Sequence, residues 1–126
     1  MKLDWTEGEL GKGLRCYRAC EFFAAHEHWE IVWLASKEPE KTFLQGVIQV
    51  AAAFYHLQRD NPLGTLFLLR RAQLRLQRYP EYFGGMDVSS LRGEIADWLQ
   101  VLEAGGSIHG RSYPELRRGG KAGVTI

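Results

Sequence analysis

The sequence predicts an all-α fold, a small bundle of about four main helices followed by an irregular C-terminal tail. Apolar residues recur at helical spacing in several segments, no stretch shows strand-like alternation of useful length, and turn-forming residues separate the helical segments. At 126 residues, the chain is long enough to bury one core but not two. We therefore expect a single helical domain.

The first predicted helix runs from about Glu7 or Gly13 to about Ser36, and the Lys-Glu-Pro-Glu segment at 37–40 ends it. The second predicted helix runs from about Lys41 to about Arg59. Apolar residues occur on nearly all sides of this second segment, which is typical of a central, buried helix.

The third predicted helix begins at a sharp boundary, where Asn61 suits the N-cap and Pro62 suits the first helical position. It extends to Arg78 or Tyr79 and stops before Pro80.

A turn-rich stretch over residues 81–88 leads to Ser89 and Ser90, which can cap a fourth helix. That segment carries an amphipathic stripe made of Leu91, Ile95, Trp98, Leu99 and Leu102. We take residues 1–104 as the bundle domain and 105–126 as a Gly-rich basic tail. We expect the tail to be extended or partly mobile, and pinned through Ile108, Tyr113 and Leu116.

Composition gives no reason to expect a membrane or nucleic-acid protein. The formal net charge is +1, and no apolar run approaches the roughly 20 residues that span a bilayer. The start of the chain has an early acid and no apolar signal core, so we expect a cytoplasmic protein that is not exported. Cys16 and Cys20 fit small buried hydrophobes better than a disulfide or a metal site.

Polar side chains interrupt the apolar faces of the first two predicted helices. On the first helix, His26, Glu27 and Glu30 share the apolar face, while His28 falls on the opposite side. On the second helix, three polar residues lie in one narrow stripe. Because buried polar groups are costly unless they are partnered, we expect the two sets to face each other. The predicted buried cluster comprises His26, Glu27, Glu30, Gln45, Gln49 and His56.

These residues belong to a longer pattern. The motif A-H-E-x-x-E-x-x-W matches residues 25–33, and L-Q-G-x-I-Q-x-A-x-A-x-x-H matches residues 44–56. The motif G-N-x-x-G-A matches at Asn61 and Gly64, with Asp60 in place of glycine and Thr65 in place of alanine. Over about residues 17–102, the chain thereby resembles a small prokaryotic helical family known as domain of unknown function 309. The resemblance implies an all-α fold and no activity that transfers to this chain.

Three interpretations of the cluster remain open. His26, Glu30 and His56 could hold a divalent metal as a two-histidine, one-carboxylate set. Glu27 would then be the general base of a hydrolase-like, metal-dependent enzyme.

A second interpretation is a pocket for a small polar ligand between the first two helices. Its walls would be Trp29 or Trp33 and Tyr55, and its polar contacts would be Gln45, Gln49 and His56. The third is a polar core that fixes helix register. We favour a structural or small-ligand-binding protein over the enzyme, and commit to no catalytic residue.

Two further features concern partners. The third helix carries several arginines, which fit a solvated basic face better than a phosphate contact, so we do not expect nucleic acid. These are Arg70, Arg71, Arg75 and Arg78, with Arg59 just before them. The aromatic excess around Trp29, Trp33 and Tyr55 leaves two alternatives, burial in the monomer or a homodimer through a helix face.

Overall fold

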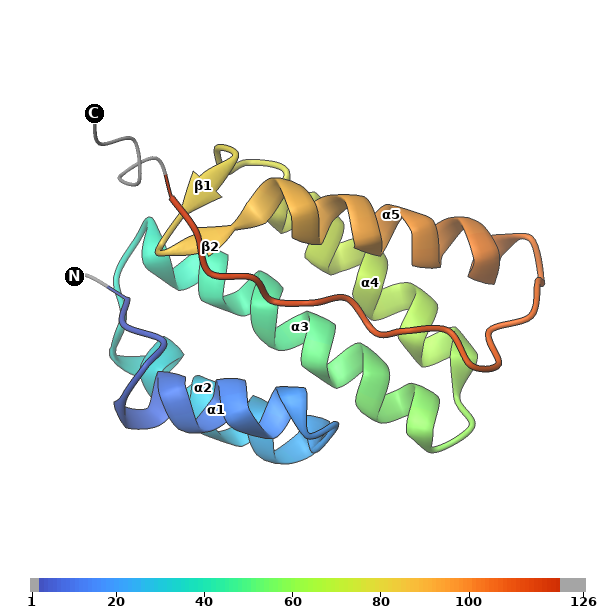
Figure 1. Cartoon of the computed structure of the whole chain (residues 1–126), viewed down its shortest axis with the longest axis horizontal. Coiled ribbons are helices and arrows are strands. Elements are labelled where there is room, and N and C mark those ends of the chain that lie inside the picture. Colours follow the sequence, from blue (N-terminus) through green and yellow to red (C-terminus); the bar gives the residue numbers. More distant parts are fainter. Residues whose placement is uncertain (1–2, 121–126) are drawn as a thin grey trace.

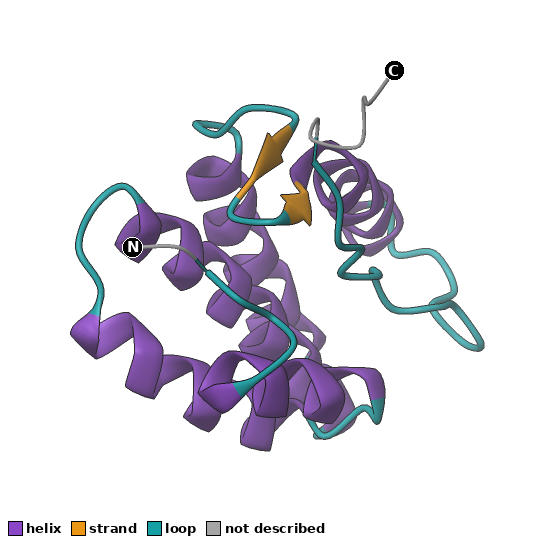
Figure 2. Cartoon of the chain, turned by 60° about the vertical axis from the view of Figure 1, so that its left-hand side comes forward, coloured by secondary structure: helices purple, strands orange, loops and turns teal. Residues whose placement is uncertain are grey.

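The central element of the fold is α3 (Glu40–Gln58). The structure, a computed structural model, describes residues 3–120 of the chain. α3 packs against α2 (Phe22–Ala35) on one side and α4 (Pro62–Leu76) on the other, while α1 (Gly8–Arg18) packs on α2 and α5 (Val88–Glu103) on α4 (Figure 1). Figure 2 shows that the described part of the chain is mostly helical, with one short pair of strands. The predicted all-α class is confirmed.

α3 has buried residues from Phe43 to Phe54, and among its residues only Gln58 at its end is exposed, as expected of a central helix that is apolar nearly all round. Phe43, Val50 and Phe54 have no exposed surface. At Gly46, an added Cβ would lie 3.0 Å from the Leu76 side chain, so glycine allows α3 and α4 to approach closely here. No helix in residues 3–120 is both long enough and apolar enough to cross a bilayer.

The single helix predicted from about Glu7 or Gly13 to Ser36 is wrong, because the structure has two helices there. The chain reverses over residues 19–21, where Cys20 adopts a left-handed conformation with a φ of 62°. No proline or glycine marks this break, so the sequence gives no turn signal. The reversal also exposes Cys20 and leaves Cys16 half-buried, which contradicts the expectation that both cysteines are core residues.

Packing between α1 and α2 explains the reversal. The indole of Trp29 is completely buried, and its Nε1–H donates a hydrogen bond to the Leu10 carbonyl at 3.1 Å. An added Cβ at Gly13 would lie 2.2 Å from that Nε1 atom, so only glycine leaves room for the ring. Burying so large an aromatic surface favours the hairpin over one continuous helix.

The connection between α3 and α4 follows the predicted boundary. Asn61 is the N-cap, with its Oδ1 accepting from the Gly64 amide at 3.1 Å, and Pro62 is the first helical residue. The two departures from the family pattern also have a physical basis. Asp60 has a φ of 55°, a left-handed conformation that explains the glycine of the family pattern and that aspartate adopts more often than most other residues. Thr65 is buried, and its hydroxyl donates to the Ala53 carbonyl at 2.9 Å.

The turn-rich stretch contains a short hairpin. β1 (Tyr82–Phe83) and β2 (Met86–Asp87) pair antiparallel around Gly84 and Gly85, which have φ values of 58° and 77°. Asp87 then caps α5, accepting from the Ser90 amide at 2.9 Å. The predicted cap at Ser89 and Ser90 is therefore wrong, because an aspartate just before them takes that role.

The C-terminal segment 108–118, which we call the strap, runs extended across the front of the bundle in Figure 1. Leu116 is buried, while Tyr113 and Ile108 are half-buried against the core, so the predicted pinning is confirmed. The Tyr17 hydroxyl donates to the Pro114 carbonyl at 2.6 Å. Residues 121–126 of the predicted tail lie outside the described residues.

Candidate functional site

The predicted burial of the six-residue polar cluster is wrong. Glu27 and Glu30 are exposed, and the other four members are half-buried. The reason is the orientation of α2, whose core-facing side is set by Ala25 and Trp29, both completely buried. His26 and Glu30 lie to one side of that face, towards the edge of α3. The polar stripe of α3 likewise lies at an open side of the helix, between α2 and α4.

His26 and His56 nevertheless come together. Both line one small pocket of about 170 Å³ between α2 and α3, with Phe23, Ala52 and Tyr55 as the other lining residues. The ring centroids of Phe23 and Tyr55 are 5.2 Å apart, and those of Phe23 and His26 are 5.7 Å apart. The pocket thus combines two imidazoles with two aromatic rings.

His26 is held by its own helix. Its Nε2 atom lies 3.5 Å from Oε2 of Glu30, one turn along α2. Its Nδ1 atom is buried, and within residues 3–120 no group forms a hydrogen bond with it. If Nε2 carries the ring proton and donates towards Glu30, Nδ1 is a hydrogen-bond acceptor. A buried polar atom is nearly always paired in native proteins, so this nitrogen is prepared for a partner.

His56 is oriented by Asn61 and Gly64. The Asn61 Oδ1 atom accepts from the Gly64 amide, which directs the Asn61 Nδ2 group to the His56 Nδ1 atom at 3.1 Å. Because an amide nitrogen only donates, Nδ1 accepts and the proton of the neutral ring lies on Nε2. An added Cβ at Gly64 would lie 2.7 Å from Asn61 Nδ2 and 3.0 Å from His56 Cγ. Glycine is thus required for this contact.

The other predicted members do not join the pocket. Gln49 accepts from the Arg75 guanidinium at 3.3 Å and is thereby directed towards α4. Gln45 is half-buried further along the α3 stripe, outside the pocket lining. Of the three aromatic walls suggested by the sequence, Tyr55 lines the pocket, Trp29 is in the core and Trp33 packs under Lys41.

The predicted metal set is not assembled. In residues 3–120, no three His, Cys, Asp or Glu side chains are grouped so that they could hold a metal ion. His26 and Glu30 are adjacent, but His56 sits on another helix with Nδ1 engaged by Asn61. Glu27 is exposed and does not line the pocket, so the structure does not support its assignment as a general base.

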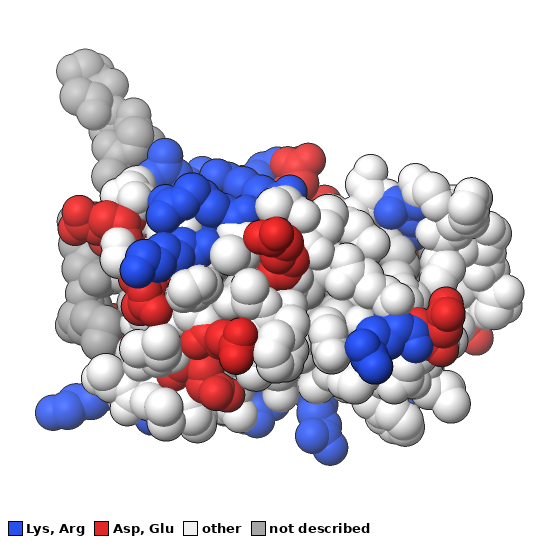
Figure 3. All heavy atoms as spheres, turned by 90° about the horizontal axis from the view of Figure 1, so that it is seen from below, with Lys and Arg blue, Asp and Glu red and all other residues white. Residues whose placement is uncertain are grey.

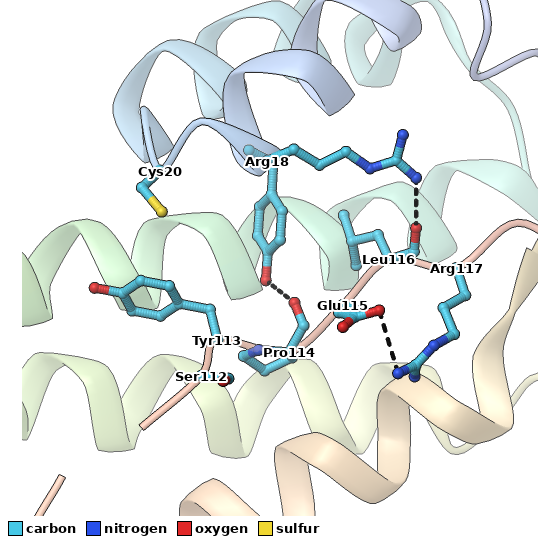
Figure 4. A pocket seen from close by; sticks show the side chains of 9 residues that line it. Arg18, Cys20, Ser112, Tyr113, Pro114, Glu115, Leu116 and Arg117 are labelled. Atoms are coloured by element: carbon cyan, nitrogen blue, oxygen red, sulfur yellow. Dashed lines mark hydrogen bonds and ion pairs between the residues drawn. The ribbon is translucent and has the colours of Figure 1, made fainter. Parts of the chain in front are cut away.

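A larger hollow of about 410 Å³ lies where the end of α1 meets the strap (Figure 4). Arg18 donates to the Leu116 carbonyl at 3.3 Å, and Arg117 pairs with Glu115 at 3.2 Å. Many of its polar groups are therefore already engaged in attaching the strap. Sequence reasoning missed this hollow because it depends on where the tail packs, and no helical pattern gives that position.

The comparisons with known proteins agree with the resemblance seen in the sequence. The family model described as "Domain of unknown function (DUF309)" matches residues 10–68, which include α2, α3 and the start of α4. A protein of Aquifex aeolicus (strain VF5), named "Uncharacterized protein", is 29% identical over 113 residues. That alignment covers 88% of this chain and 32% of the relative, so the chain spans about a third of that protein's length.

Proposed function

We propose a function from the site itself, because the description of the family model that matches residues 10–68 names no activity. The domain binds a small neutral ligand in the pocket between α2 and α3. The observation that carries this proposal is the convergence of His26 and His56 on one pocket from two different helices. Both histidines and the residues that orient His56 lie within the part of the chain that the family model matches.

The two imidazoles offer complementary hydrogen bonds. His56 presents an Nε2–H donor, because Asn61 engages its Nδ1 atom. His26 lines the same pocket, and when its Nε2 atom donates to Glu30 its Nδ1 atom is an acceptor that has no partner within residues 3–120. A ligand that pairs with both therefore carries one acceptor and one donor.

Charge and size narrow the ligand further. The Glu30 carboxylate lies 3.5 Å from His26, so a second negative charge in the pocket would be repelled. The volume of about 170 Å³ corresponds to five or six water molecules at ~30 Å³ each. Phe23 and Tyr55 supply flat apolar walls. A small planar carboxamide meets these conditions better than a carboxylate.

The test is a titration with acetamide followed by NMR signals of the histidine rings, with acetate as the charged comparison. We expect the ring signals of His26 and His56 to shift with acetamide, and those of His28 and His109 to stay in place. His28 is held by Glu9 at 3.1 Å on the α1 side, and His109 is exposed at the start of the strap.

Substitutions separate pocket binding from nonspecific effects. His26→Ala and His56→Ala should each weaken acetamide binding by about 10-fold, the loss expected from one hydrogen bond of about 1.4 kcal/mol. His109→Ala is the matched control and should leave binding unchanged. Ring signals of His26 and His56 that do not move up to about 100 mM acetamide, or that move equally with acetate, would refute the proposed ligand class.

A further inference from the structure

The bundle has one face that its own chain covers and one that it leaves open. The strap crosses the front of α3 (Figure 1), and the Pro114 and Leu116 side chains of the strap are buried. On the other side, the polar stripe of α3 lies between α2 and α4. Every large hydrophobic side chain that is exposed in residues 3–120 belongs to α2 or α4: Phe23, Ile31, Leu34, Leu63, Phe67 and Leu74.

Contacts with α3 show that these two helices border the same face. From α2, His26 and Phe23 lie beside Ala52 and His56 of α3. From α4, Gly64 lies against His56, and Arg75 bonds to Gln49. We call this surface, with the α3 stripe as its floor and α2 and α4 as its sides, the α2–α4 face.

The two sides of this face differ in charge. α2 contains two glutamates, Glu27 and Glu30, and no lysine or arginine. α4 contains three arginines, Arg70, Arg71 and Arg75, and no acid. Arg70 pairs with Glu103 of α5 at 2.9 Å and Arg75 bonds to Gln49, so Arg71 is the arginine left to meet a partner. Seen from below, acidic and basic side chains lie mainly on one half of the molecule, and much of the remaining surface in that view is uncharged (Figure 3).

Exposed apolar side chains have the same spacing along α2 and α4. On α2, Phe23 and Leu34 are 48% and 67% exposed, with the glutamates between them. On α4, Leu63 and Leu74 are 66% and 58% exposed and have the same separation in sequence, about 16 Å along a helix. Phe67, 59% exposed, and Arg71 lie between them. Each side therefore has apolar ends and a charged middle, with opposite signs.

We propose that the α2–α4 face binds a second copy of this chain. Both α2 and α4 run opposite to α3, so they are parallel to each other (Figure 1). A two-fold axis parallel to α3 places α2 of each copy on α4 of the other, with matching ends level. Glu30 of one copy then faces Arg71 of the other.

The charges select this axis over the alternative. A two-fold axis that runs across the helices would place α2 against α2 and α4 against α4, so that acid faces acid and arginine faces arginine. Interfaces with two-fold symmetry are self-complementary, and a surface with one acidic and one basic side satisfies that condition in only one orientation. Six half-exposed apolar side chains on one pair of helices also exceed the scattered hydrophobic residues of an ordinary monomer surface.

Sedimentation equilibrium tests the proposal without any ligand, so its outcome is independent of the proposed pocket function. We expect the wild-type chain to sediment at twice its monomer mass of 14.4 kDa. Glu30→Arg and Arg71→Glu should each place two like-charge contacts in the dimer and weaken association by about 100-fold. Arg15→Glu makes the same change of charge on the exposed side of α1 and should leave the dimer intact.

Mixing the two variants is the experiment that decides whether position 30 of one copy faces position 71 of the other. In a mixed pair, the arginine introduced at position 30 of the first variant faces the glutamate introduced at position 71 of the second. The original Glu30 and Arg71 form the other contact, so the dimer should be restored. A wild-type chain that sediments at 14.4 kDa would overturn the proposal. A wild-type dimer whose two variants stay monomeric when mixed, or associate normally alone, would overturn the proposed arrangement.

Discussion

Replacing Gly64 with alanine should loosen the contact that orients His56. The new Cβ would lie 2.7 Å from the Asn61 Nδ2 atom, 3.1 Å from Asn61 Cγ and 3.0 Å from His56 Cγ. Asn61 cannot move aside freely, because its two ends bond to the Gly64 amide and to the His56 ring. We therefore expect the asparagine side chain to leave its position.

The magnitude follows from three contributions. Alanine in place of glycine within a helix stabilises by about 0.5–1 kcal/mol. Loss of the Asn61 cap costs about 1 kcal/mol, and loss of its hydrogen bond to His56 costs about 1 kcal/mol more. The net result is a destabilisation of about 1 kcal/mol, or roughly 4 °C in Tm for a chain of this size.

Gly93→Ala provides a matched control. Gly93 lies inside α5, and nothing stands within 4 Å of the position that its Cβ would take. This variant should be more stable than wild type by about 0.5–1 kcal/mol, because only the helix propensity changes. Urea unfolding followed by circular dichroism measures both variants, and NMR of the His56 ring reports whether the proton still resides on Nε2. Equal stabilisation by the two substitutions would refute the close contact at Gly64.

Two further substitutions test the packing of α1. Burial, together with the charge of Glu94, raises the pKa of Tyr17 far above its ordinary value near 10. The neutral phenol therefore stabilises the folded state below about pH 10, and this contribution is lost as the pH rises further. Tyr17→Phe should lower the free energy of unfolding by about 1 kcal/mol at pH 7, because the hydrogen bond to the Pro114 carbonyl is lost. In urea unfolding, the stability of this variant should fall less than that of wild type between pH 9 and about pH 11. An equal fall in both proteins would contradict a buried phenol at position 17. Gly13→Ala should destabilise by about 2–3 kcal/mol, because the ring of Trp29 must move, and a Tm within about 2 °C of wild type would contradict that packing.

The fold could be predicted wherever the signal is local. The Asn61–Pro62 boundary and the uniformly apolar segment of α3 carry their own structural meaning, since a cap and a buried helix each depend on a few neighbouring residues. The break at Cys20 could not be predicted this way. It depends on the fit of Trp29 against Gly13, two residues of different helices that local propensity does not connect.

The candidate site was only partly predictable, for a related reason. Helical spacing correctly placed His26 beside Glu30 and placed His56 on the stripe of α3. It could not give the rotation of α2 about its axis, which Trp29 determines, and so it placed the exposed residues Glu27 and Glu30 in the core. The family pattern already contained Asn61 and Gly64, but their role at His56 depends on the turn between α3 and α4.

The amide side chain of Asn61 has a consequence for local unfolding. The same group closes the first turn of α4 and determines which nitrogen of His56 carries the proton. The Gly64 amide can exchange with solvent only when that turn opens, and the same opening releases His56 from its tautomer. A molecule held by the Nε2–H of His56 would therefore slow hydrogen exchange at Gly64, so occupancy of the pocket and fraying of α4 form one linked equilibrium.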